Sequence, residues 1–158
     1  MYNVALFFLL CFILTSLQTR AQTACVAQTR FANFWYFGYG GAIDFISGTP
    51  VAVPGSAMNT SEGAASISDA NGTLLFYTNG VSVYDNTNHR MPNGKNLWGH
   101  DNTTQSVLIV PDPGNGNLYY VFTVDQLGGQ HIGEAGDLGM GGLSYSVVDI
   151  TLNGGWVT

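Results

Sequence analysis

Three carboxylates stand where sugar chemistry could use them: Asp44, Glu62 and Asp69. A glycoside hydrolase needs two carboxyl groups that flank the bond to be cleaved. No spacing along the chain places two of the three side by side, so we expect them to serve in turns and at strand ends, and we expect no catalytic residue. Glu62 is the most informative of them, because Glu62-Gly63 directly precedes a stretch of small and apolar residues, 64–68. A charged residue at that place is predicted to point into a channel or a turn network.

The run from Asp69 to Gly72 is similar both to a calcium-binding loop and to the Asp-box turn of sialidase-type propellers. Calcium takes about six to eight oxygen ligands, but apolar residues follow at once from Leu74 onward. The favoured interpretation is a hairpin turn stabilised by the Asp69 side chain. A calcium ion near Asp69 and Asn71 is the less favoured alternative, and no other cofactor is expected.

Histidine and cysteine spacing predicts no metal site. His89, His100 and His131 are 11 and 31 residues apart, whereas zinc motifs bring their histidines within a few positions of one another. Cys25 is the single cysteine after the N-terminal segment that carries Cys11, so no internal disulfide is expected. The sequence also lacks the Gly-x-Ser-x-Gly elbow of serine hydrolases.

Aromatic residues offer a binding function instead of a catalytic one. An exposed aromatic ring presents a flat apolar face with a polar edge, which suits stacking on a sugar ring. Most aromatics of this chain lie in predicted strands and are expected in the core, but Trp98 stands in a polar loop, residues 93–104. The candidate ligand-binding residues are therefore Trp98, Glu62 and Asp69.

The charge balance excludes two classes of partner. The chain has four basic and ten acidic residues, and Arg20 lies in the predicted leader described below, which leaves Arg30, Arg90 and Lys95 as the basic residues of the mature segment. Nucleic-acid binding needs clustered Lys and Arg, and binding to anionic lipid needs a polybasic patch. We expect neither.

Strands separated by turns must position these side chains. Twenty-one glycines and the lack of a sustained helical apolar period after residue 21 predict an all-β chain without a helix of ordinary length. The predicted strands are residues 33–39, 64–68, 73–78, 81–85, 105–110, 118–125 and 143–150. Turn signals stand at residues 69–72, 79–80, 92–94 and 111–116. Asn79-Gly80 in particular predicts a tight hairpin.

A faint internal repeat links two groups of these strands. Residues 75–78 match residues 120–123 at an offset of 45, and each segment is followed by a Gly-(Val/Leu)-Ser strand, at residues 80–85 and 142–149. A period of about 40–50 residues with three or four strands per unit is typical of propeller blades. We expect antiparallel sheets arranged as partial β-propeller blades, with a β-sandwich as the alternative.

The N-terminus predicts export. Residues 4–17 are apolar except for Thr15 and Ser16, which makes a stretch too short to span a bilayer but suited to the hydrophobic region of a signal peptide. Small residues at Thr19 and Ala21 place cleavage after Ala21, with Ala24 as the second choice. Residues 1–3 contain no Lys or Arg, which leaves an uncleaved anchor as the less favoured alternative. We expect residues 1–21 to be a helical signal peptide that leaves no membrane span after cleavage.

The rest of the chain divides into a flexible N-terminal segment, residues 22–32, and a propeller-like region, residues 33–158. A propeller needs at least four blades, and the 137 residues after Ala21 provide for about three. The expectation is that this region is truncated at its C-terminus.

Several motifs resemble the N-terminal region of large surface proteins of gliding bacteria. The likeness extends from about residue 33 to residue 155, and its motifs lie at residues 34–38, 43–45, 62–63, 66–80, 91–94, 104–106, 109–111, 119–123 and 143–149. Proteins of that family are long and exported. In them a propeller-like region precedes immunoglobulin-like repeats and a C-terminal sorting domain read by the type IX secretion machinery.

The resemblance implies a secreted or cell-surface protein, exported through the Sec pathway, that meets the secretion machinery. It implies a non-catalytic module for adhesion or surface binding, associated with gliding motility, whose partner is a surface polysaccharide or another cell-surface protein. It transfers no catalytic residue, and we expect the chain not to be an enzyme. The alternative is a glycan-active hydrolase of sialidase-like propeller architecture.

Overall fold

The computed structural model describes residues 29–126, 142–152 and 155–158. The predicted signal peptide, Cys25 and His131 lie outside these residues, as do residues 22–28 of the expected N-terminal segment and most of the loop that joins the last two predicted strands. No helix of the described residues is long and apolar enough to cross a membrane.

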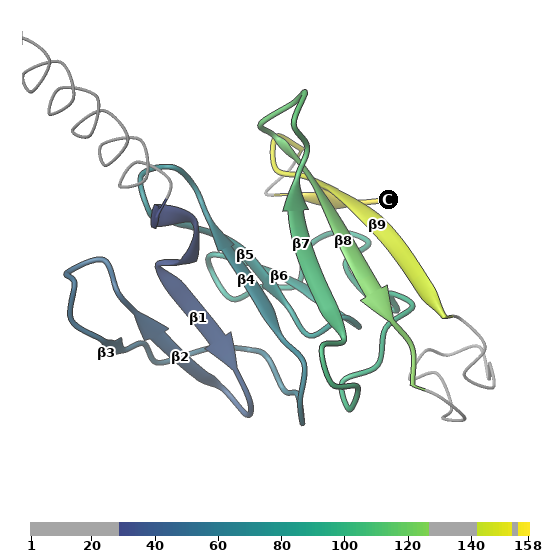
Figure 1. Cartoon of the computed structure of the whole chain (residues 1–158), viewed down its shortest axis with the longest axis horizontal. Helices are drawn as coiled ribbons and strands as arrows, with labels where there is room; N and C mark the ends of the chain where they lie inside the picture. The colour runs from purple at the N-terminus through teal and green to yellow at the C-terminus, as the bar shows by residue number, and fades with distance from the viewer. Residues whose placement is uncertain (1–28, 127–141, 153–154) are drawn as a thin grey trace, which may run out of the picture.

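The described residues form an all-β structure of three antiparallel sheets, which follow one another across the molecule in chain order (Figure 1). The first sheet contains β1 (Phe34–Phe37), β2 (Gly41–Asp44) and β3 (Val51–Ala52). The second contains β4 (Ala65–Ser68), β5 (Leu74–Thr78) and β6 (Val83–Asp85). The third contains β7 (Val107–Pro111), β8 (Leu118–Val124), β9 (Leu143–Asp149) and β10 (Trp156–Val157). Each sheet is an open meander whose first strand lies at an edge.

These first strands lie next to one another, since β1 contacts β4 and β4 contacts β7. A hydrogen bond fixes the first of these contacts, because the Ser66 hydroxyl donates to the carbonyl of Phe34 at 2.6 Å. The edge strands β1, β4 and β7 therefore form a row, and the later strands of each sheet extend away from this row.

The middle sheet is covered on both sides, because each side packs in its own apolar core. The core it shares with the third sheet centres on Phe76, whose ring meets Tyr119 edge-on at 5.5 Å between centroids. The core it shares with the first sheet centres on Tyr77, whose ring stacks on Tyr36 at 4.0 Å. The core between the middle and third sheets contains the buried residues Ile67, Phe76, Val83, Met91, Leu97, Tyr119, Val121, Val148 and Val157. The core between the middle and first sheets contains the buried residues Tyr36, Ala42, Met58, Leu74 and Tyr77.

An irregularity in β4 and β5 explains how one short strand supplies both cores. The pairing shifts between Ile67 and Ser68, so that Ile67 faces Phe76 and Ser68 faces Leu74. An extra residue in a ladder breaks the alternation of side chains between the two faces. Leu74 and Phe76, two positions apart, therefore belong to different cores.

All seven predicted strands contain or overlap an observed strand, and the two repeated groups occupy equivalent places. Residues 75–78 lie in β5 and residues 120–123 in β8, each the second strand of its meander, and the segments that follow contain the third strands, β6 and β9. The short strands β2, β3 and β10 were not predicted.

The prediction of a tight hairpin at Asn79-Gly80 is wrong. Four residues connect β5 to β6, and of the pair only Gly80 has a positive φ, at 83°. The buried Asn79 instead accepts hydrogen bonds through its side-chain oxygen from the N–H groups of Val81 and Ser82, at 3.0 and 2.8 Å. The side chain of Asn79, not its own backbone angle, makes the turn.

The described end of the expected N-terminal segment has a defined conformation. Residues Thr29–Ala32 form a short 3-10 helix, η1, that contacts β4. The Arg30 guanidinium donates to the carbonyl of Asn71 at 3.3 Å, which ties η1 to the turn between β4 and β5.

Candidate functional site

Two loops that carry predicted site residues join into one surface beside the start of β4 and β7. Residues 55–63 lie in the connection between β3 and β4, and residues 86–106 connect β6 to β7. The Tyr77 side chain connects the two loops. Its hydroxyl accepts a hydrogen bond from the N–H of Ala57 at 3.0 Å and donates one to the side chain of Asn88 at 2.9 Å. Tyr77 is fully buried, so this junction is held by the core.

The same loops meet again at the carbonyl of Asp101. That oxygen accepts from the N–H groups of Ser61 and Glu62 at 3.2 and 3.0 Å, and from the Thr60 hydroxyl at 3.0 Å. A side-chain hydrogen bond closes the junction, because the Thr104 hydroxyl donates to the Glu62 carboxylate at 2.7 Å. Glu62 therefore belongs to a turn network at the surface, one of the two settings predicted for it.

Trp98 is in the second of these loops and is exposed, as predicted, with 45% of its surface accessible. The chain on either side is anchored, since Leu97 and Gly99 donate backbone hydrogen bonds to the carbonyls of Val81 and Gly80 at 3.0 and 3.1 Å. Tyr39 adds a second exposed ring to this surface, because its hydroxyl lies 3.1 Å from the hydroxyl of Ser61. Polar groups and two aromatic rings thus share one hydrogen-bonded region.

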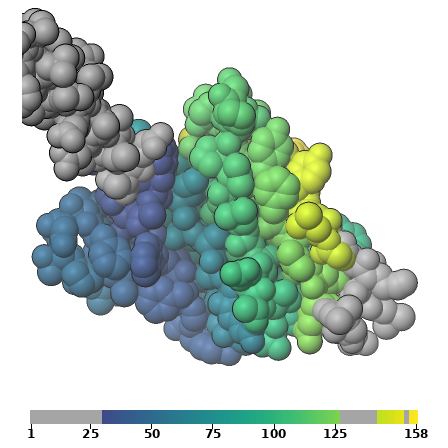
Figure 2. All heavy atoms as spheres, in the orientation of Figure 1, coloured from purple at the N-terminus to yellow at the C-terminus, as the bar shows by residue number. Residues whose placement is uncertain are grey.

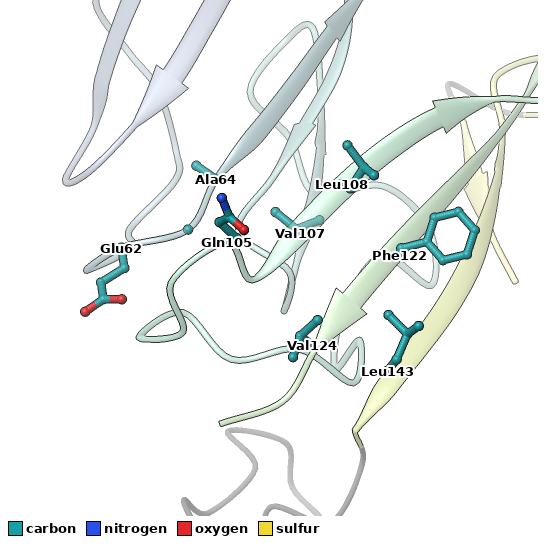
Figure 3. A pocket seen from close by; sticks show the side chains of 9 residues that line it. Glu62, Ala64, Gln105, Val107, Leu108, Phe122, Val124 and Leu143 are labelled. Carbon is teal, nitrogen blue, oxygen red and sulfur yellow. The ribbon is translucent and has the colours of Figure 1, made fainter. Parts of the chain in front are cut away.

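A pocket of about 870 Å³ begins at this surface and extends over the third sheet (Figure 3). Glu62 lies at one end of it, whereas Phe122 and Leu143 lie at the other. Its lining residues are Glu62, Gly63, Ala64, Gln105, Val107, Leu108, Phe122, Val124 and Leu143. Glu62 is the one carboxylate among them, so the pocket lining does not supply the pair that glycoside hydrolysis requires.

Asp69 is not part of this surface. Glu62 precedes β4 and Asp69 follows it, so the two carboxylates lie beyond opposite ends of the strand. The Asp69 carboxylate accepts from the N–H groups of Asn71 and Thr73, both at 2.8 Å, and a backbone bond from Asp69 to Thr73 closes the turn. The interpretation of this run as a hairpin turn stabilised by Asp69 is confirmed.

Several other aspartates act in the same way. The Asp44 carboxylate accepts from the N–H of Ile46 at 2.7 Å, and equivalent bonds to the residue two positions on are made by Asp85, Asp112 and Asp149. These carboxylates organise turns. The described residues, with their gaps at 127–141 and 153–154, contain no group of three His, Cys, Asp or Glu side chains able to hold a metal ion.

The turn bonds shift three aspartate pKa values downward. The N–H of Gly114 and the hydroxyl of Tyr120 hold the pKa of Asp112 below its ordinary value. The hydroxyl and N–H of Thr151 do the same for the pKa of Asp149. At Asp85, burial acts to raise the pKa, but hydrogen bonds from the two residues that close its turn outweigh burial, and the pKa is lowered.

These shifts predict a loss of stability in acid. A carboxylate whose pKa is lower in the folded state stabilises the fold above its unfolded pKa of about 3.9, and this stabilisation is lost as the pH falls through the folded value. We expect the melting temperature to be steady above about pH 5 and to decline below about pH 4. The triple variant Asp85→Asn, Asp112→Asn, Asp149→Asn keeps the turn oxygens without their charge, so its melting temperature is expected to decline less. Thermal melts followed by circular dichroism between pH 7 and pH 2.5 measure this, and equal declines would contradict it.

Sequence reasoning missed the apolar wall of the pocket. Leu108, Phe122, Val124 and Leu143 lie in predicted strands, but nothing in the prediction placed them on an outer face. The signal in the sequence is that β7 and β8 are almost continuously apolar, which indicates that both faces of these strands are apolar but not which face is the outer one.

Comparisons with known proteins identify no relative of this chain. No model of a known protein family matches the chain, and neither a curated protein nor a solved structure matches it.

Proposed function

We propose that the chain is the propeller-like part of an exported, non-catalytic surface module that binds a surface polysaccharide through the loop surface around Trp98 and Glu62. The observation that carries the proposal is the junction of the two loops, residues 55–63 and 86–106, into one hydrogen-bonded region with exposed aromatic rings. In the same proposal, the module is secreted or displayed at the cell surface through the Sec pathway and the type IX machinery, and serves adhesion in gliding.

The arrangement of sheets supports a propeller-like build. Three meanders follow one another in chain order, and their first strands, β1, β4 and β7, lie side by side. Propeller blades are sheets of this kind set around a central axis, each beginning at its innermost strand. The middle sheet is packed on both faces, as an interior blade is.

The chemistry of the loop surface supports a sugar ligand. Trp98 and Tyr39 present aromatic faces, and Glu62 and Gln105 add groups that can accept or donate hydrogen bonds. A sugar ring offers the matching combination of apolar C–H faces and hydroxyl edges. The carboxylates that could pair in hydrolysis are used in turns, which favours binding over catalysis.

Replacing Trp98 by alanine is expected to weaken polysaccharide binding about tenfold, since the loss of one stacking face is comparable to about 1.4 kcal/mol. The matched control is Phe31→Ala, which removes an exposed ring from η1, at the opposite end of β4. A panel of purified neutral and acidic polysaccharides, screened on an array and followed by isothermal titration, measures the affinity.

Three results would contradict the proposal. Binding that the two variants weaken equally would remove Trp98 from the site. Capture of a cell-surface protein with no affinity for any polysaccharide of the panel would assign a different partner to this surface. Release of reducing sugar ends by the unmodified chain, abolished by Glu62→Gln, would make the protein a hydrolase.

A further inference from the structure

The two outermost sheet faces of the molecule are apolar and exposed. On the third sheet, Leu108 of β7 is 60% exposed and Tyr145 of β9 is 63% exposed. On the first sheet, Trp35 of β1 is 54% exposed and Phe37 is 43% exposed. Monomeric soluble proteins rarely expose such residues in contiguous groups, and groups of this kind generally mark interaction sites.

The face of the third sheet is organised by strand register. Leu108, Phe122 and Tyr145 are directly paired across β7, β8 and β9, and Val124 pairs with Leu143. The rings of Phe122 and Tyr145 lie 6.0 Å apart, and Tyr120 completes a cluster of three rings. In Figure 2, β7 and β8 (green) lie at the surface turned to the viewer. We call this surface the third-sheet face.

The opposite face has the same character. Trp35, Ile43 and Ala52 form one cross-strand row over β1, β2 and β3, while the neighbouring pair, Tyr36 and Ala42, is buried in the core. The ring of Trp35 contacts Phe45 at 5.1 Å between centroids. We call this surface the first-sheet face.

Within the strands that the structure describes, neither face carries a charge that would oppose contact between them. Across the strands of the first and third sheets, the charged residues are Asp44 and Asp149, the last residues of β2 and β9. Both sheets already pack against the middle sheet through their other faces. A contact between the first-sheet face and the third-sheet face would therefore repeat an arrangement of sheet on sheet that the molecule makes twice within itself.

We infer that the third-sheet face binds the first-sheet face of a second copy of this chain. The contact is head-to-tail, because each copy uses two different surfaces, and such contacts build rings where the rotation closes and open chains where it does not. Trp98 takes no part in this contact, but the third-sheet face adjoins the proposed polysaccharide site, because Leu108, Phe122, Val124 and Leu143 also line the pocket that begins at Glu62. The oligomeric state and polysaccharide binding are measured separately, so one can fail without the other.

Sedimentation velocity over a range of concentrations tests this inference. The strands involved are short, so the contact is smaller than the standard interface of about 800 Å² per partner, and we expect association in the micromolar range. The unmodified chain is expected to grow in mean mass with concentration. Leu108→Asp on the third-sheet face and Phe37→Asp on the first-sheet face are each expected to stay monomeric, whereas Leu152→Asp, an exposed leucine on the loop after β9, is expected to associate as the unmodified chain does.

Mixing the two monomeric variants gives the decisive measurement. Each retains one intact face, so the mixture is expected to form a one-to-one dimer that does not grow further. Tyr145→Ser and Phe37→Ser serve as milder replacements if a cooperative thermal melt shows that an aspartate variant has not folded.

Two results would overturn the inference. A dimer that Phe37→Asp leaves intact would show that the third-sheet face pairs with itself. An unmodified chain that stays monomeric at all concentrations would show that a second copy does not cover the face, whatever else does.

Discussion

Replacing Phe76 by alanine is expected to lower the free energy of unfolding by about 4 kcal/mol, because it removes a fully buried ring from the centre of the larger core. The ring packs against Tyr119 of the third sheet, so its loss opens a cavity between two sheets that the local backbone cannot easily close. Domains of this size are stable by about 5–15 kcal/mol, so the variant loses a large share of its stability. Urea denaturation followed by circular dichroism measures the difference.

Phe122→Ala is the matched control for this experiment. Phe122 lies on β8, the counterpart of β5 in the repeat, but it points to the third-sheet face and is partly exposed. Its replacement is expected to cost about 1 kcal/mol. Equal losses in the two variants would contradict the assignment of the core to the contact between the second and third sheets.

The long strands could be predicted from the sequence because local signals agree there. In residues 64–85, β4, β5 and β6 alternate with turn residues, and the Asp69 turn fixes the first hairpin. The repeat at an offset of 45 then identifies β7, β8 and β9 as a second meander, because a similar sequence occupies a similar place in its sheet.

The remaining elements depend on tertiary contacts that leave little trace in the sequence. β3 and β10 have two residues each, too few for a periodic pattern, and exist because an existing strand pairs with them. β2 (Gly41–Asp44) pairs with β1 along its full length, but it is preceded by glycines that resemble a loop. At Asn79 the dipeptide rule for hairpins failed because the side chain is buried and bonds to Val81 and Ser82 instead.

The sequence predicts an exposed binding surface of this kind, but it does not predict which residues belong to that surface. An exposed Trp98 follows from its polar loop, and Glu62 from its place before β4. Asp69 was grouped with them because its turn is similar to a calcium loop and to an Asp-box, and β4 separates it from Glu62. The pocket wall could not be placed, because assigning Leu108 and Leu143 to an outer face requires knowing which face of the third sheet meets the middle sheet.

The place where β4 begins gives the second large effect. Gly63, the neighbour of Glu62, has space for no side chain, because a Cβ there would come within 2.7 Å of both the backbone nitrogen and the Cβ of Ser106, and closer still to its hydroxyl. Gly63→Ala is expected to lower the free energy of unfolding by about 3 kcal/mol through this steric conflict. The loop between β3 and β4 must then move away from the loop before β7, and the bond from Thr104 to Glu62 is expected to break with it.

Two further variants isolate the steric cause. Gly116→Ala is the matched control, since a Cβ at Gly116 meets nothing within 4 Å, and it is expected to change stability by less than about 0.5 kcal/mol. Adding Ser106→Gly to Gly63→Ala removes the hydroxyl and Cβ of Ser106 but leaves its backbone nitrogen, so we expect about half of the lost stability to return. Urea denaturation of the unmodified chain, Gly63→Ala, Ser106→Gly and the double variant gives the coupling free energy between the two positions. A double variant no more stable than the sum of its single changes would show that the loops do not meet at Gly63 and Ser106.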